Sequence, residues 1–460
     1  MKRTVCELFA GVGGFRCGLN AIKTIQDTEK AEKWKTVWFS QWEPGKKDQW
    51  AHDCYVNHFG QSLDLNGADT TNMDIAAVNK TAIPDHNLLV GGFPCQDYSV
   101  ARSLSGEKGI EGKKGVLWWS IRSVIQAKNP PFVLLENVDR LVKSPSTQRG
   151  RDFGIILACL RAEGYIVEWR IINAAEYGYV QRRRRTFIFA YKQNSSFGKS
   201  VLDSISYNPN NEASECLDAA RTLFESKGFF AQSFPVSPLE DNAKIKTTVM
   251  SEDIVDVSDN FKFLFENSGF MVDGKVFTHK TTPIECEPTL LGEIIEDKEA
   301  AEKYFVPEER LYYTNPEQKY SDETECDLPK ESRQTWQYMK GGKKRLRTAK
   351  NGHEYVFSEG PIPMIDEWDA PARTMLTSEG SFNRSTHIVR DKISKRVRIL
   401  TPIEAERIQG FPDDWTKECL VNGSIKPMTE RMRYFCMGNA LVVNLIAQME
   451  PLLSKIIDNE

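Results

Sequence analysis

A cysteine that follows a short apolar run is the residue of this sequence best placed for covalent chemistry. In the segment Leu88–Gln96 an apolar run is followed by two glycines, a phenylalanine and Pro94, and Cys95 comes next. Such a run predicts a buried strand that delivers Cys95 to the loop past its carboxyl end, where open parallel sheets do chemistry. A thiolate is a strong nucleophile, and Pro94 fixes the backbone just before it. The alternative is a buried structural cysteine, which is the usual role of this residue type.

Three acidic residues also follow predicted strands. Glu43 comes after the strand 35–40, Asp74 lies in the predicted end of a third strand at 72–75, and Glu136 follows the apolar run 130–135. We expect Glu43 to accept hydrogen bonds from two ribose hydroxyls and Asp74 to accept one from an adenine amino group. Four apolar residues precede Glu136, so partial desolvation would favour its protonated form and suit it as a proton donor. Each could instead be a surface or structural carboxylate, but with Cys95 they make four such residues at one sheet edge.

A glycine turn follows the first predicted strand. Thr4–Phe9 reads as a strand, Ala10–Gly14 as the turn, and Phe15–Leu19 as the start of a helix. This is the first unit of a nucleotide-type α/β fold, although the spacing is not the G-x-G-x-x-G that cradles a pyrophosphate. The glycines would let a ligand lie close to the backbone, Phe9 could stack on a purine, and Trp42 would flank the same ligand. A turn that only packs a helix on a strand is the alternative.

Two stretches of the first 195 residues are rich in basic side chains. Four arginines at 182–185 lie between two predicted closing strands, 165–172 and 186–190. Alternation along an extended backbone would send Arg183 and Arg185 to one side, towards the site, whereas a solvated or phosphate-binding face is the alternative. The polar stretch 97–116 interleaves glycines with lysines and predicts a functional loop or a lid.

A third basic stretch lies in the second half of the chain. Residues 340–350 combine glycines with lysines and arginines, and Trp336 and Tyr338 come just before them. This pattern suits a loop that enters a DNA groove, and a solubilising loop is the alternative.

Composition limits the class of protein. The 460 residues are 40% hydrophobic and 27% charged, which is typical of a soluble globular protein of two domains. No apolar run approaches the ~20 residues of a membrane span, and the first residues read as a strand rather than a signal peptide, so we expect a cytoplasmic protein. Ten scattered cysteines without a C-x-x-C pair argue for reduced thiols and against zinc. With a net charge of −4, a DNA-binding face would have to be a local basic patch.

Changes of texture along the chain predict its organisation. Residues 1–195 form an α/β domain, and the apolar terminal helix within 434–460 completes it. Residues 196–395 begin with linker-like segments and continue with acidic stretches and short β-like runs. We expect them to form a second, smaller domain. Residues 396–433 form a hinge segment with a helix that Thr401 caps, Pro402 begins and Gly410 ends.

Several of these motifs, in this order, resemble those of bacterial-type DNA (cytosine-5) methyltransferases. The resemblance covers roughly the first 195 and the last 65 residues, and Thr374 resembles the threonine that the family places near the target-base phosphate. It implies a Rossmann-like, mostly parallel sheet of the S-adenosylmethionine-dependent methyltransferase fold with an irregular or β-rich target-recognition domain. The matching segments are Phe9–Gly14, Gly92–Gln96, Glu136–Val138, Gln181 with Arg183 and Arg185, Arg398–Trp415, and Gly438–Asn439.

The resemblance also implies a chemistry and its residues. Cys95 would add to carbon 6 of a flipped-out cytosine while Glu136 bonds nitrogen 3, and Arg183 and Arg185 would stabilise charge. Carbon 5 would then accept the methyl group of S-adenosyl-L-methionine. The implied cofactor contacts are Phe9, Ala10, Gly11, Gly13, Gly14, Trp42, Glu43, Asp74, Ile75, Pro94, Asn439 and Ala440. The implied DNA contacts are Gln96, Ser99, Lys113, Lys114, Lys343, Lys344, Arg345, Arg347 and Thr374.

The expected partner is double-stranded DNA. We expect a monomer that needs no metal and no membrane, and that belongs to a restriction-modification system with a separate endonuclease. Two other functions fit the same residues. One is a transfer-RNA cytosine-5 methyltransferase, which the large variable region disfavours. The other is a DNA-binding repressor with vestigial catalysis, which intact Cys95, Glu136 and Arg183 disfavour.

Overall fold

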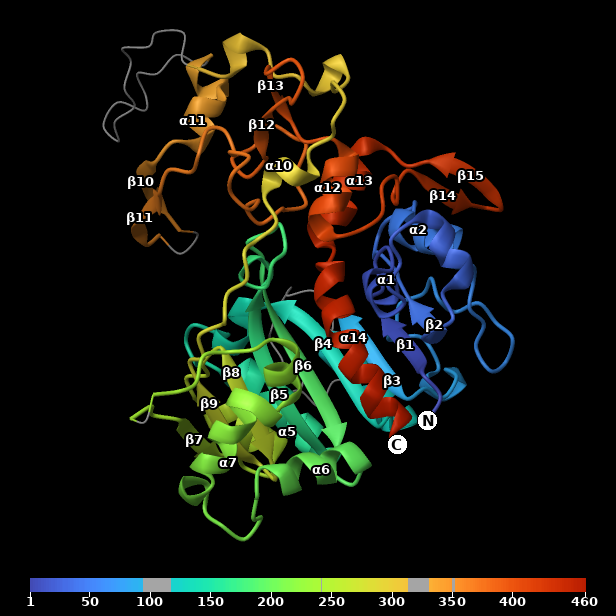
Figure 1. The fold of residues 1–460 in the computed structure, drawn as a ribbon, viewed down its shortest axis with the longest axis vertical. Coiled ribbons are helices and arrows are strands. Elements are labelled where there is room, and N and C mark those ends of the chain that lie inside the picture. The colour runs from blue at the N-terminus through green and yellow to red at the C-terminus, as the bar shows by residue number, and fades with distance from the viewer. Residues whose placement is uncertain (94–116, 241, 313–330, 350–351) are drawn as a thin grey trace.

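The computed structural model describes residues 1–93, 117–240, 242–312, 331–349 and 352–460. Figure 1 shows a larger body built around one sheet and a smaller body above it. In the described part of the chain the large sheet has nine strands in the order β2-β1-β3-β4-β6-β5-β8-β9-β7. Strands β1 to β5 and β9 run in one direction, so the sheet is mixed and mostly parallel by strand direction. The neighbours within β2-β1-β3-β4 pair in parallel, and the other neighbouring pairs are antiparallel.

The parallel half of the sheet forms where the sequence predicts apolar strands. Strands β1, β3 and β4 are buried almost throughout because helices cover both faces of the sheet. The predicted closing pair is antiparallel and follows β4. The bounds are β1 Thr4–Leu8, β2 Lys35–Ser40, β3 Leu88–Gly92, β4 Phe132–Val138, β5 Tyr165–Asn173 and β6 Arg184–Lys192.

Three further strands extend the sheet beyond β5. They are β7 Lys246–Val249, β8 Ser268–Val272 and β9 Lys275–His279. These residues were expected in the smaller domain, 196–395, but β8 pairs with β5 and so belongs to the large sheet. A side chain at Gly269 would collide with the ring of Trp169, which crosses it. The pattern that could have revealed this hairpin is Asp273–Gly274 between two apolar runs, because both residues adopt the positive φ that a tight hairpin turn needs.

The expected third strand at 72–75 is absent, since these residues form turns and a bend. Asp74 lies on a turn, where its carboxylate accepts the backbone N–H of Ala76 at 2.9 Å. Asp, Asn and Ser side chains favour such local bonds over a strand, which explains the wrong prediction.

Helices cover both faces of the sheet. Helices α1, α6 and α14 share one apolar core with the first face, and α4, α5 and α9 share another with the second. The helices of the large body are α1 Gly14–Leu19, α2 Trp50–Phe59, α4 Leu117–Lys128, α5 Arg151–Ala162, α6 Ser196–Ser204, α7 Leu217–Thr222, α8 Phe229–Ser233, α9 Ile254–Asn260 and α14 Val443–Asp458.

The last helix packs against the first. A Cβ atom at Gly18 of α1 would lie 2.5 Å from Cβ of Ile446 in α14, so the close approach of the two helices depends on glycine. Figure 1 shows α14 crossing the sheet and both chain ends lying side by side. The amino group of Met1 donates to the carbonyl of Ile457 at 2.8 Å.

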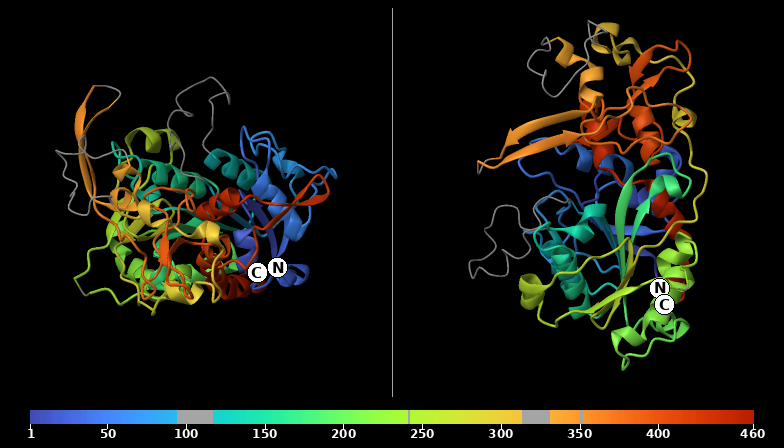
Figure 2. Two further views of the ribbon diagram at one scale, coloured as in Figure 1. Left: turned by 90° about the horizontal axis from the view of Figure 1, so that it is seen from above. Right: turned by 90° about the vertical axis from the view of Figure 1, so that its left-hand side faces the viewer.

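The smaller body consists of short helices and two-stranded hairpins. The predicted helix after Thr401 is present, with a capping box between Thr401 and Glu404 and with Gly410 left-handed at its end. Figure 2 shows the β10–β11 hairpin projecting from this body. The elements of this second half are α10 Leu291–Ile294, α11 Trp336–Lys340, α12 Pro402–Gln409, α13 Glu430–Asn439, β10 Lys343–Thr348, β11 Glu354–Glu359, β12 Ile388–Arg390, β13 Val397–Ile399, β14 Glu418–Val421 and β15 Ser424–Pro427.

Among the described residues, no single helix has the length and apolar character to cross a membrane. Only the bent pair of α13 and α14, taken together, reaches the required length and composition.

Candidate active site

Glu136 lies at the carboxyl end of β4, paired in register with Gly92 at the end of β3. Its side chain is 13% exposed, and Oε1 lies 2.8 Å from Nε of Arg185. A Cβ atom at position 92 would lie 3.1 Å from the other carboxylate oxygen, so glycine leaves room for this side chain. The structure therefore brings together two of the predicted catalytic residues, Glu136 and Arg185, in a charge-assisted pair.

Asn137 fixes the chain that leads towards the predicted nucleophile. Its buried amide donates to the carbonyl of Phe93 at 2.8 Å, and its side-chain oxygen accepts the N–H of Val138. This contact ties the exit of β3 to the end of β4. The predicted residues that follow Phe93 lie outside the described residues: Pro94, Cys95, Gln96, Ser99, Lys113 and Lys114.

Arg183 does not share the position of Arg185. Its buried guanidinium donates to the carbonyls of Met375 at 2.9 Å, Gly438 at 3.0 Å and Ala440 at 2.9 Å. The alternation argument fails because β6 begins only at Arg184, so Arg183 is outside the regular strand. Burial lowers the pKa of Arg183 to about 9, the charge of Arg185 acts in the same direction, and Glu136 opposes both. The guanidinium of Arg183 thus joins three separate chain segments, whereas that of Arg185 pairs with Glu136.

A segment of the smaller body pairs with the arginine run. Gln181 and Ala372 form a parallel bridge, and the N–H of Arg182 donates to the carbonyl of Ala372 at 2.8 Å. The hydroxyl of Thr374, which is exposed, donates to the carbonyl of Arg182 at 2.6 Å. The residues around Thr374 are thus held against the short segment that also carries Arg185.

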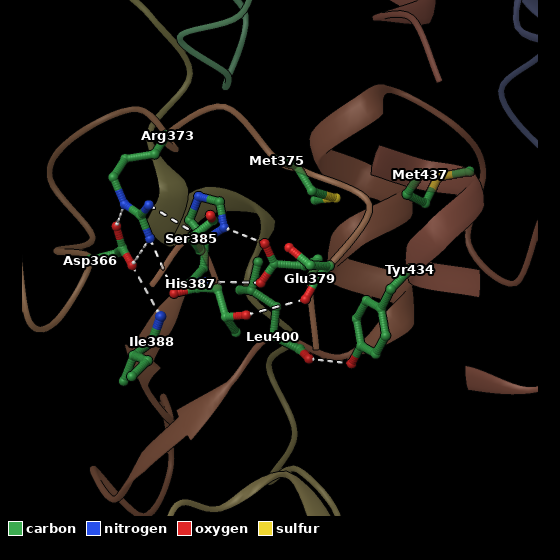
Figure 3. Close-up of polar contacts among 12 residues, drawn as sticks. Asp366, Arg373, Met375, Glu379, Ser385, His387, Ile388, Leu400, Tyr434 and Met437 are labelled. Carbon is green, nitrogen blue, oxygen red and sulfur yellow. Dashed lines mark hydrogen bonds and ion pairs between the residues drawn. The ribbon is translucent and has the colours of Figure 1, made fainter. Parts of the chain in front are cut away.

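A polar cluster that the sequence analysis missed supports this segment from the other side (Figure 3). Asp366 accepts bonds from Arg373 at 2.5 Å and from the N–H of Ile388 at 3.0 Å. Burial raises the pKa of Asp366, but the bond from Arg373 and the charges of His387 and Lys340 outweigh it and lower the pKa to about 2. The residue next to Thr374 is therefore anchored in the core of the smaller body.

Glu379 and His387 form the second pair of this cluster, fully buried and 2.9 Å apart. The intervening chain passes close to α13, since a Cβ atom at Gly380 would lie 2.3 Å from the ring of Tyr434. The Tyr434 hydroxyl donates to the carbonyl of Leu400 at 2.5 Å, as Figure 3 shows. No local pattern in the sequence predicts these contacts, because they join separate segments of the chain.

The glycine turn after β1 forms a backbone ledge. Phe9, Gly11 and Gly13 have φ values of 55°, 56° and 90°. The N–H of Gly11 donates to the side chain of Gln41 at 2.8 Å, which joins the ledge to the end of β2. A Cβ atom at Gly11 would meet no described atom within 4 Å, so the space beside it is open to a ligand. At Gly13, by contrast, it would lie 2.8 Å from the ring of Phe59, so that glycine serves packing.

The other expected cofactor contacts lie at the ends of β2 and α13. Glu43 is half-buried, burial raises its pKa, and its N–H is held by the side chain of Gln49. Trp42 beside it is 37% exposed. The loop that carries Asp74 runs past the end of β2, because the N–H of Gln41 donates to the carbonyl of Thr71 at 2.9 Å. In the remaining expected set Ala10, Gly14 and Ile75 are buried, Ala440 is partly buried, and Asp74 and Asn439 are exposed.

Glu7 is a buried carboxyl to which the sequence analysis gave no role. It is the fourth residue of β1, and its Oε2 accepts the hydroxyl of Tyr55 at 3.0 Å. Its Oε1 has no hydrogen-bond partner among the described residues. Burial raises the pKa of Glu7 to about 7, against the lowering effects of Tyr55 and Arg16. An acidic residue inside an apolar strand is the signal that could have singled it out.

The predicted basic DNA contacts differ in position. Lys343 is buried, and its ammonium donates to the carbonyls of Met339 and Gly341 within the smaller body. Lys344 and Arg347 are exposed on β10, whereas the side chain of Arg345 lies outside the described part. Within the described ranges no group of three or more His, Cys, Asp or Glu residues could hold a metal ion.

Comparisons with known proteins give the chain its relatives. The sequence profile described as C-5 cytosine-specific DNA methylase matches residues 3–452. The Type II methyltransferase M.Sau3AI of Staphylococcus aureus is 45% identical over 462 residues, which cover 99% of this chain and 96% of that protein. The Type II methyltransferase M.NgoBI of Neisseria gonorrhoeae is 33% identical over 43% of this chain and 53% of its own length.

Solved structures share the fold at low sequence identity. The Dnmt2 methyltransferase of S. pombe superposes with a TM-score of 0.51 at 13% identity, over 100% of this chain and 99% of that one. A DNMT2 mutant from Spodoptera frugiperda gives a TM-score of 0.52, also at 13% identity, over 99% of this chain and 100% of that one.

Proposed function

Because this chain belongs to the C-5 cytosine-specific DNA methylase family, we propose that it methylates carbon 5 of one cytosine within a specific sequence of duplex DNA. One observation carries the proposal. Strand β3 lies between β1 and β4, so the open ledge at Gly11 and the pair of Glu136 with Arg185 flank the end of the strand that leads to Cys95. A methyl donor and a cytosine could meet at this edge.

S-adenosyl-L-methionine is the cofactor that the family implies, and the ledge fits it. The open space beside Gly11 supports a ligand held against the backbone, with Phe9 stacking on the base and Glu43 accepting from the ribose. Asp74 would accept from the adenine amino group. The bound cofactor supplies an electrophilic methyl group.

Cys95 and Glu136 activate the acceptor carbon in the proposed mechanism. Carbon 5 of cytosine is too weak a nucleophile by itself, and both ring faces are covered in a duplex, so the base must leave the stack. The Cys95 thiolate forms a bond to carbon 6, and the displaced electron pair becomes delocalised over carbon 5 and nitrogen 3. Glu136 gives its proton to nitrogen 3, which leaves carbon 5 enamine-like and nucleophilic.

The same two residues close the cycle. After methyl transfer, a water takes the proton on carbon 5, and the carbon 6–sulfur bond breaks to restore the ring double bond and the thiolate. Glu136 recovers its proton from nitrogen 3. Arg185 holds the carboxyl of Glu136 through its 2.8 Å contact and stabilises charge that develops on the base.

We further propose a role for each body. The large body, including 246–279, would carry the chemistry, and much of 280–395 would recognise the target sequence. The chain would act as a monomer in a restriction-modification system with a separate endonuclease, in keeping with relatives named Type II methyltransferases. Bisulfite sequencing of plasmid from an expressing host would give the recognised sequence and the methylated cytosine.

A trapping experiment tests the covalent step. Duplex DNA with 5-fluorocytosine at the target is expected to form a stable adduct with the protein, because fluorine cannot leave as a proton does. The adduct should map to Cys95 by mass spectrometry. Cys95→Ala should lose both adduct and methyl transfer while still binding DNA, and Cys286→Ala, which changes an exposed free cysteine, should keep both. Methylation by Cys95→Ala would contradict the mechanism.

The acceptor is tested with labelled cofactor. Tritiated S-adenosyl-L-methionine should label duplex DNA at carbon 5 of cytosine and leave transfer RNA unlabelled. Label on transfer RNA alone would replace the proposal with the RNA enzyme, and DNA binding without transfer would favour the repressor.

A further inference from the structure

The β10–β11 ribbon stands away from the rest of the smaller body. Figure 2 shows it projecting beyond the helices and hairpins around it. Leu346 and Val356 are directly opposite in register, and they are 67% and 62% exposed. An isolated two-stranded ribbon is only marginally stable, and exposed apolar pairs mark surfaces that contact a partner. The ribbon therefore has the character of a binding element.

The base of this ribbon is fixed. Lys343 and Arg384 both donate to the carbonyls of Met339 and Gly341. Glu359, opposite Lys343, lies 3.9 Å from the ammonium of Lys343 and 3.8 Å from the guanidinium of Arg384. Lys343, Arg384 and Glu359 thus form a clamp at the point where β10 and β11 leave the smaller body. This clamp fixes the direction of the two strands beyond it.

One face of the ribbon carries a prearranged arginine. The guanidinium carbon of Arg347 lies 3.7 Å from the centre of the Phe357 ring, and Tyr355 is opposite Arg347 in register. Residues 355 and 357 share a face because side chains alternate along a strand. Stacking restrains the arginine side chain while the N–H groups at the edge of the guanidinium plane stay available for a planar, two-point contact.

The charge of the ribbon suits a polyanion. Beyond the clamp of Lys343 and Glu359, β10 contains Lys344, Arg345 and Arg347, and β11 contains one acidic residue, Glu354, in a chain with a net charge of −4. The major groove of B-DNA admits a two-stranded ribbon, and guanine offers arginine two acceptors there, N7 and O6. We propose that β10–β11 enters the major groove of the target DNA and that Arg347, stacked on Phe357, reads a guanine of the recognised sequence. This inference rests on the proposed function.

Methylation specificity tests the ribbon. The wild type, Arg347→Lys and Phe357→Leu would be incubated with a library of duplexes in which each position around the target varies, and 5-methylcytosine would be read by bisulfite sequencing. Arg347→Lys keeps the positive charge but loses the two parallel N–H donors of the guanidinium. The preference for guanine should therefore fall about 5- to 150-fold at one position of the site and stay unchanged at the others. Phe357→Leu should relax the same position to a smaller extent. Lys426→Ala, which removes an exposed cation from the β14–β15 hairpin, is the matched control.

The outcomes separate the two proposals. Unchanged specificity in Arg347→Lys and Phe357→Leu would overturn the reading role. A uniform loss of methylation in Arg347→Ala, with a shallower salt dependence, would show a phosphate contact and would also overturn it. Absence of 5-methylcytosine in the wild-type reaction would instead contradict the proposed function.

Discussion

The guanidinium of Arg183 donates a 3.0 Å hydrogen bond to the carbonyl of Gly438, 255 residues further along the chain. The same side chain reaches Met375, so one residue joins the segment before β6, the segment around Met375 and the end of α13. Gly438 permits this because a Cβ atom there would lie 2.3 Å from the backbone nitrogen of Thr377. Arg183 thus fastens the smaller body to the sheet edge at which Glu136 lies.

We expect Arg183→Met to destabilise the protein by about 3 kcal/mol, because it leaves three carbonyls without their charged donor in the interior. Urea unfolding would measure this. Arg184→Met, which alters an exposed neighbour, should change stability little. If Arg183 acted on the substrate instead, its loss would lower kcat while the urea midpoint stayed that of the wild type.

Glu136→Gln should slow methyl transfer by about 10²- to 10⁴-fold, because the amide cannot donate a proton to nitrogen 3 as the carboxyl does. Transfer of tritiated methyl groups to duplex DNA in single-turnover conditions is the measurement. Glu418→Gln, on the exposed side of β14, is the control. A Glu136→Gln rate near that of the wild type would show that the assigned role is wrong.

Gly11→Ala should weaken cofactor binding, because a methyl group would occupy the open space beside the ledge. The left-handed backbone also makes alanine cost ~1 kcal/mol of stability. Gly423→Ala is the matched control, with φ of 74° and equally open surroundings in the turn between β14 and β15. Both variants should lose similar stability, and titration calorimetry with S-adenosyl-L-methionine should detect weaker binding in Gly11→Ala alone. Equal affinities would remove Gly11 from the cofactor site.

Glu7 should make stability depend on pH. Burial raises its pKa to about 7 from the 4.5 of an ordinary glutamate, so the folded state keeps a proton that the unfolded chain releases between these values. The free energy of unfolding therefore falls as pH rises through this window. Glu7→Gln removes this titration and keeps an acceptor for Tyr55. The stability of the wild type relative to the variant should decline from about pH 4.5 to 7 and then level off, whereas parallel urea-midpoint curves would refute a buried titrating Glu7.

Local patterns were sufficient to predict much of the fold. The apolar runs before Glu136 and Cys95 predicted β4 and β3, and Thr401, Pro402 and Gly410 predicted the ends of α12. These signals reside in neighbouring residues, which is why they can be recognised without a structure. Alternation predicted that Arg185 points towards the site, and its guanidinium lies 2.8 Å from Glu136.

The failures concern contacts between distant segments. Arg183 was expected to point with Arg185, but its carbonyl partners lie in segments that follow it by 192 to 257 residues. Lys343 was expected on the surface, and its ammonium instead bonds carbonyls at the base of its own ribbon. The extension of the sheet by β8 likewise depends on pairing with β5, about 100 residues earlier. Such partners leave no periodic trace in the sequence.

The packing of α14 against α1 has a consequence for biosynthesis. The ribosome makes α1 long before α14, whose residues cover it, and the partners of Arg183 at Gly438 and Ala440 are likewise made well after Arg183 itself. A nascent chain can form β1 and the glycine ledge before it has the residues of α13 and α14 that pack against this region. Translation products that stop before residue 443 should therefore be cleaved by proteases faster than the 460-residue chain.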